Sequence, residues 1–297
     1  MKLFLKIVWA IGLAMALFYQ PVFAAGTAYE FGVTGTEYRF DDAGGTQDAD
    51  GYGVKFKAGV PLSLGRGTAL TLGMSLQYTR MDWGDVTLSR GGTTYALPED
   101  LAKASLSAAL RFPLNRGLMG LARVQGTLAS DLEDISGEDF SGLGMVSVFW
   151  LLGKERRIGL GAGYSEGLND STFFPVVTAT WRFDSQWIFR LNAPRNISMG
   201  YPVTQTFEAG AMASLVSNSY RMTEDAPFNS AVFSMKEIFA GVYGDVKLAQ
   251  FTTIRLQAGV LLDREIELTD EDDEDITLAD RDADNAPIVS LAIRRVF

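Results

Sequence analysis

The chain has 297 residues, a formal net charge of −10, and neither cysteine nor histidine. The missing cysteines exclude disulfides and thiolate metal sites, and the missing histidines exclude the general base that many serine hydrolases use. A strongly acidic chain is also a poor partner for nucleic acid, because it repels the phosphate backbone.

The first residues have the pattern of a secretory signal peptide. Lys2 and Lys6 precede an apolar stretch, residues 7–19, and small residues suitable for cleavage follow. A transmembrane anchor is the alternative, but the apolar run is shorter than the roughly 20 residues that a spanning helix needs. We predict that residues 1–24 are removed and that residues 25–297 form one domain, whose net charge is −12 without the two leader lysines.

Segments with a period of two follow one another along the rest of the chain. Residues 52–60 and 70–78 show the pattern most clearly, because an apolar residue stands at every second position. This is the period of a β-strand, whose successive side chains point to opposite faces. The same pattern predicts further strands at residues 27–40, 103–112, 118–128, 142–152, 158–164, 173–183, 187–191, 195–201, 206–220, 231–248, 252–268 and 287–297.

These segments predict a transmembrane β-barrel of the outer membrane. They number 14, or 12 if the pair around Ala193 and Pro194 does not span. Short turns alternate with longer polar loops, as periplasmic turns and extracellular loops do in bacterial barrels. Aromatic residues gather beside the short turns, where an interfacial girdle would place them: Phe112, Trp150, Trp181, Phe183, Trp187, Phe189, Tyr201 and Phe251.

A soluble β-sandwich is the alternative fold, because its strands also alternate. In a sandwich the apolar faces pack against each other, and large residues dominate the core. Here the apolar face is rich in Ala, Leu and Val, whereas the other face carries Gly, Ser, Thr, Gln and Arg. Lipid outside and water or polar packing inside fit this division better. The ladder must then close, since lipid cannot satisfy a free sheet edge.

The sequence offers little sign of catalysis. Residues 163–167 match the G-x-S-x-G pattern around Ser165, but that motif needs a strand–turn–helix and a nearby base. Ser234 and Lys236 share a strand face and could in principle form a dyad. The simpler interpretation is structural in both cases. Gly159, Gly161 and Gly163 are expected to leave room on the inner face for long side chains of neighbouring strands. We predict no enzymatic activity, no cofactor and no metal site.

Charged residues on the predicted inner face bear on function more directly. Strand parity assigns the following residues to the lumen: Lys55, Lys57, Arg111, Arg123, Arg182, Arg190, Lys247, Arg255 and Arg294. Asp263, Glu265 and Glu267 are expected to face inward near the long loops. Either these charges pair across a closed lumen, or they line a water-filled passage with a basic lower half and an acidic mouth. An open lumen should prefer anions, with Arg111, Arg182 and Arg255 setting the selectivity.

The last long loop carries an acidic run: Asp270, Glu271, Asp272, Asp273, Glu274 and Asp275. A solvated extracellular loop, kept extended by its own repulsion, is the simplest interpretation. Weak Ca²⁺ or Mg²⁺ binding, bridging to lipopolysaccharide phosphates, is the alternative, but no EF-hand spacing is present.

The C-terminal strand ends in Phe297, and its alternate apolar residues resemble the signal by which the barrel-assembly machinery recognises outer-membrane proteins. Residues 240–248, 261–268 and 285–288 resemble an uncharacterised family of Gram-negative outer-membrane β-barrel proteins, a domain of unknown function. The resemblance is clearest over the last hundred residues. It implies the barrel fold and an outer-membrane location, and it implies no catalytic residue.

Together these patterns predict an outer-membrane β-barrel that acts as a passive, porin-like pore for small solutes. A sealed structural or adhesive barrel, acting through its extracellular loops, is the alternative. The expected partners are outer-membrane lipid, lipopolysaccharide and the assembly machinery, without nucleic acid. The pattern specifies no oligomeric state.

Overall fold

The computed structural model describes residues 27–42, 45–83, 87–90, 93–131, 137–153, 155–168, 171–222, 231–249, 251–269 and 285–296. The predicted signal peptide, the acidic run at residues 270–275 and Phe297 lie outside these ranges.

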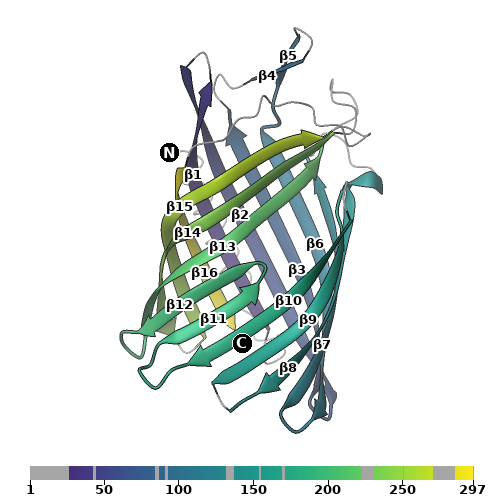
Figure 1. Ribbon diagram of the computed structural model, residues 1–297, viewed down its shortest axis with the longest axis vertical. Helices are drawn as coiled ribbons and strands as arrows, with labels where there is room; N and C mark the ends of the chain where they lie inside the picture. Colours follow the sequence, from purple (N-terminus) through teal and green to yellow (C-terminus); the bar gives the residue numbers. More distant parts are fainter. Residues whose placement is uncertain are drawn as a thin grey trace.

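Fourteen antiparallel strands close into a barrel (Figure 1). The barrel fold and the predicted count of 14 are thereby confirmed, and the sandwich is excluded because the sheet closes on itself. In sequence order the strands are β1 (Ala28–Asp42), β2 (Gly45–Gly65), β3 (Thr68–Asp82), β6 (Asp100–Asn115), β7 (Leu118–Ser130), β8 (Phe140–Leu151), β9 (Arg156–Glu166), β10 (Ser171–Arg182), β11 (Ile188–Ala193), β12 (Asn196–Pro202), β13 (Phe207–Arg221), β14 (Val232–Ala249), β15 (Thr252–Thr269) and β16 (Ala286–Val296).

Two smaller elements lie outside the ring. The hairpin of β4 (Thr87–Arg90) and β5 (Thr93–Ala96) forms a separate two-stranded sheet within the loop after β3, where the sequence predicted only a long loop. The 3₁₀ helix η1 (Gly137–Asp139) follows β7. Within the described ranges, no helix is long and apolar enough to cross a membrane.

Cross-strand register distinguishes an inner from an outer face. Lys55, Gln77, Lys103 and Ala129 lie opposite one another on β2, β3, β6 and β7, and Ala129 is almost fully buried. Residues of the other parity are exposed apolar side chains, such as Leu106 at 72%. The face that shares its parity with Ala129 is therefore the inside of the barrel.

Inner glycines make room for aromatic rings. A Cβ on Gly159 would meet the ring of Phe149, and a Cβ on Gly163 would meet the ring of Phe174. Gly161, between them, lies against the backbone of β8 at the carbonyl of Val146. The prediction that these glycines leave space for long neighbouring side chains is confirmed for Gly159 and Gly163, whereas Gly161 makes room for the backbone of β8. A ring laid over a glycine also shields backbone that would otherwise face water.

The barrel wall is shortest at the hairpin of β11 and β12. These two strands have six and seven residues, about half the length of their neighbours β10 and β13. Residues 171–176 of β10 and 215–220 of β13 consequently pair with another strand on one side only. The two short strands form as predicted, but they do not reach the end of the barrel where the long loops lie, here called the long-loop end (upper end in Figure 1).

The barrel narrows at the long-loop end because β13 crosses to β7. Arg221 of β13 lies opposite Ser130 of β7, and the amide of Asp131 donates to the carbonyl of Arg221 at 3.2 Å. The contact leaves β8 to β12 outside the narrowed ring, so at most nine of the fourteen strands enclose the space beyond it. A ring of about eight strands has an interior that side chains can fill.

A β-bulge in β15 reverses the predicted parity of its last residues. Lys236 lies opposite Glu265, and Ile238 lies opposite Leu262, so two residues of β15 face a single residue of β14. Asp263 takes a positive φ of 47° at this point. The prediction that Glu265 and the nearby Glu267 face inward was wrong, because the extra residue turns both to the outside.

Candidate functional site

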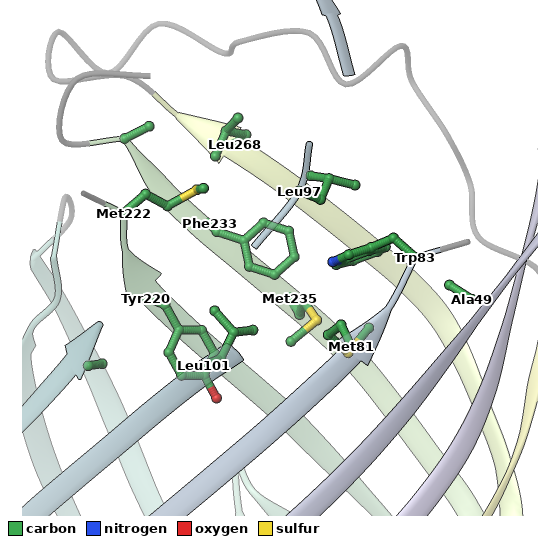
Figure 2. Packing of buried hydrophobic residues seen from close by; sticks show 12 residues of the cluster. Ala49, Met81, Trp83, Leu97, Leu101, Tyr220, Met222, Phe233, Met235 and Leu268 are labelled. Atoms are coloured by element: carbon green, nitrogen blue, oxygen red, sulfur yellow. The ribbon is translucent and has the colours of Figure 1, made fainter. Parts of the chain in front are cut away.

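The inside of the barrel divides into an apolar part and a charged part. The apolar part, here called the apolar cluster, lies at the long-loop end (Figure 2). Its members come from seven strands, from the loop after β3 and from the two residues that flank the connection between β13 and β14: Ala49, Met81, Trp83, Leu97, Leu101, Ala129, Tyr220, Met222, Ala231, Phe233, Met235 and Leu268.

Trp83 and Leu97 bring the loop after β3 into the apolar cluster. The indole of Trp83 packs edge-on against Phe233, with ring centres 5.9 Å apart. Its Nε1 donates to the carbonyl of Pro98 at 2.8 Å, so the polar atom of the ring is satisfied. Each member of the cluster is at most 6% exposed. Over the described residues, the cluster therefore closes the inner space at this end, where one of the two interpretations of the sequence placed an acidic mouth.

The outside of the barrel at the same level is charged. Lys236 on β14 contacts Glu265 at 3.3 Å and Glu267 at 3.1 Å on β15. On another part of the ring, Arg80 lies 3.3 Å from Glu99. The division of faces is thus inverted at the long-loop end, with apolar residues inside and ion pairs outside.

A buried ion pair lies at the bulge, directly below this level. Nε of Arg264 donates to Oε1 of Glu237 at 3.0 Å, and the two side chains are 0% and 7% exposed. The extra residue at Asp263 brings Arg264 to the inner face opposite Glu237.

Four of the cations that face the inner space are here called the basic group: Lys55, Lys103, Arg123 and Arg195. Register places Arg123 six residues nearer the short turns than the level of Lys55 and Lys103. Lys55 and Lys103 flank Gln77 in register. Arg195, in the turn between β11 and β12, repels the charges of the other three. Three strands separate β7 from β11 along the ring, so Arg195 acts across the inner space rather than along the wall.

Polar side chains surround the basic group. Arg123 donates to Gln125 at 2.7 Å, and Gln125 donates to Thr127 at 3.1 Å. The ammonium group of Lys103 lies 5.9 Å from the ring centre of Tyr220, at the lower edge of the apolar cluster. Within the described part of the chain, no member of the basic group forms an ion pair.

Some of the cations nearer the short turns are paired instead. Arg190 donates both terminal nitrogens to Glu208, at 2.8 and 3.0 Å, and Tyr243 donates to the same carboxylate at 2.8 Å. Arg255 binds Asp245 through two hydrogen bonds of 2.7 and 2.6 Å. These pairs resemble the two-pronged contacts that arginine makes with carboxylates in general.

Register places all nine predicted lumen residues on the inner face, although their role as the lining of a passage stays a prediction. Four of them are paired with Glu30, Glu155, Glu208 or Asp245: Lys57, Arg182, Arg190 and Arg255. Among described residues, five form no ion pair: Lys55, Arg111, Arg123, Lys247 and Arg294.

Two members of the basic group were missed from the sequence. Lys103 shares the parity of Arg111 on β6, so the alternation could have revealed it. Arg195 lies in a turn, where no period predicts the direction of a side chain.

The possible catalytic motifs have structural roles. Ser165 lies in β9 and donates to the carbonyl of Gly142 at 3.4 Å, and the chain turns into another strand rather than a helix. Ser234 donates to Ser219 at 2.9 Å, while Lys236 is held by the two glutamates. Among the residues that the structure describes, no group of three acids could hold a metal ion.

Residues 35–294 match the family model described as "Domain of unknown function (DUF6268)". No curated protein matches. Among solved structures, the chain is similar to the COG4313 outer membrane channel from Pseudomonas putida F1, with 11% identity, a TM-score of 0.45, and coverage of 93% of this chain and 97% of that one. It is also similar to the P. putida toluene transporter TodX, with 9% identity, a TM-score of 0.45 and coverage of 94% and 91%. The chain is also similar to the translocator domain of autotransporter NalP from Neisseria meningitidis, with 9% identity, a TM-score of 0.38, and coverage of 100% of this chain and 96% of that one.

Proposed function

The chain belongs to the DUF6268 family, a domain of unknown function, and we propose that it is a passive channel for small solutes in the outer membrane of a Gram-negative bacterium.

The outer face supports the membrane location. Below the charged level, apolar side chains with large exposed fractions cover the wall: Leu106, Val124, Val146, Leu160, Phe173, Val242, Leu256 and Val289. Soluble monomers rarely expose apolar patches of this extent, whereas a lipid-facing barrel requires them. Exposed aromatic rings gather near the short turns, where Trp187 and Tyr201 lie 5.2 Å apart. Rings in this position suit the headgroup layer.

The observation that carries the channel is the solvent access of the inner charges. Although they lie inside a closed ring, 47% of the Lys57 side chain and 42% of the Arg255 side chain are exposed. A side-chain-filled interior would bury these groups. An inner space that holds water next to mixed charges is suited to polar solutes rather than to apolar ones.

The apolar cluster is the narrow part of the proposed passage. Passage requires its side chains, above all Trp83 and Phe233, to move apart, which makes it the step that limits flow. The same cluster favours the second candidate, a sealed structural barrel, if that movement does not occur.

Single-channel recording on refolded protein separates the two candidates. We expect small, discrete steps from the wild type and larger steps from Trp83→Ala/Phe233→Ala, because the double substitution removes the two packed rings. Leu106→Ala, on the outer face, is the matched control and should conduct like the wild type. Folding of each barrel is checked on gels, where a folded barrel migrates faster in the unboiled sample than in the boiled one. A folded wild type without steps would identify the sealed barrel.

A further inference from the structure

We infer that the basic group, Lys55, Lys103, Arg123 and Arg195, is a binding site for a small solute that carries at least two negative charges on carboxylate or phosphate groups. The inference rests on the proposed function and specifies the class of solute that the channel selects.

The geometry suits a ligand with separated charges. Lys55 and Lys103 lie two strands apart on the inner face, which corresponds to about 10 Å at the usual strand spacing. Arg195 approaches from the turn on the far side of the inner space. A monoanion can contact one or two of these cations, whereas an anion with two or three charged groups can bridge the two sides.

The protein itself supplies too little negative charge here. Glu30 is the carboxylate that attracts Lys55, but it accepts a hydrogen bond from Lys57 at 3.0 Å and also attracts Arg294. Inside a low-dielectric wall, like charges repel over longer distances than at an open surface. A bound anion would relieve this repulsion, and the relief favours its binding.

Arg123 has hydrogen-bonding capacity that the protein does not use. One terminal nitrogen donates to Gln125, while its Nε is buried without an acceptor. Most buried donors in proteins have a partner. Because the protein shields Nε, the donors that remain for a carboxylate or phosphate are those of the terminal nitrogens, which arginine uses to bind such groups in its own plane.

Other inner arginines of the barrel show the contrast. Arg190 and Arg255 each hold a protein carboxylate through two hydrogen bonds. The fold therefore neutralises some of the inner arginines with its own carboxylates, whereas within the described residues it provides no such partner for the basic group. This changes the predicted origin of anion preference, since Arg182 and Arg255 are already paired.

Isothermal titration of the refolded, full-length mature barrel in neutral detergent tests the site, with pyrophosphate as the probe. Sodium chloride of equal ionic strength is the reference. We expect pyrophosphate to bind the wild type, and Lys103→Gln/Arg195→Gln to bind at least about 100-fold more weakly, since each charge-assisted hydrogen bond accounts for roughly a factor of ten or more. Lys103→Arg, which keeps the charge, should bind within about threefold of the wild type.

Arg66→Gln/Arg116→Gln is the matched control, because it removes the same two charges from exposed short turns. It should leave pyrophosphate binding unchanged. Equal losses in the two double variants would show a general charge effect and overturn the site, as would a wild type that does not distinguish pyrophosphate from chloride. A barrel that binds but never conducts would refute the channel and leave the site, whereas one that conducts without binding would refute the site alone.

Discussion

Individual inner charges differ in whether a protein group already neutralises them. Strand parity places Arg255 on the inner face, but it does not reveal that Asp245, on the neighbouring strand, lies directly opposite. That knowledge requires the register between the two strands, which includes an irregularity between Lys247 and Ala249. For Arg195, which lies in a turn, strand parity does not predict the direction of the side chain at all. The sequence therefore predicts which charges face inward, whereas their pairing comes only from the structure.

The pair of Arg255 and Asp245 predicts that removing either partner shifts the ion selectivity of the channel, in opposite directions. Asp245→Asn should uncover the positive charge of Arg255 and make the channel more selective for anions. Arg255→Gln should uncover the carboxylate and shift selectivity towards cations. The reversal potential in a potassium chloride gradient measures both shifts. Displacement of the two variants in the same direction would contradict this pairing.

Single strands were predicted well wherever alternation is regular, and poorly where one residue breaks it. The bulge at Asp263 is an example, because one extra residue reverses the direction of each side chain after it. A signal was present, since Asp263, Arg264 and Glu265 are three charged residues in a row within an alternating strand. The hairpin of β4 and β5 left no comparable signal, because strands of four residues are too short to show a period.

The pairing of β8 with β9 depends on the absence of a side chain at Gly161. A Cβ there would collide with the carbonyl of Val146 and with Ser147. These are backbone and near-backbone atoms of the adjacent strand, so they cannot move aside without separating the two strands. Gly161→Ala should therefore lower the fraction of refolded barrel several-fold, measured as the heat-modifiable band on gels. Gly126→Ala is the control, because nothing lies within 4 Å of that Cβ. Equal yields would show that the two strands can part without loss.

For the whole molecule, the outer face should report where the bilayer ends. Val242 lies on the apolar part of β14, and Ser217 lies opposite Lys236 at the charged level. Because the chain has no cysteine, Val242→Cys and Ser217→Cys can each carry one fluorescent label. We expect lipid-borne quenchers to act on the label at 242 and aqueous iodide to act on the label at 217. Similar quenching of both labels by lipid would place the charged level inside the membrane.

The inversion of faces has a consequence for membrane thickness. On β14 the outward residues from Ile238 to Leu248 are uncharged, and Lys236 is the first charge beyond them. Ten strand steps at a tilt of about 40° rise about 25 Å. Beyond the level of Lys236 the barrel resembles a water-soluble protein, with apolar side chains inside and charged side chains outside. The ion pairs of Lys236 therefore prevent deeper immersion, and the protein matches a thin bilayer such as the bacterial outer membrane. A thicker bilayer would have to thin around it.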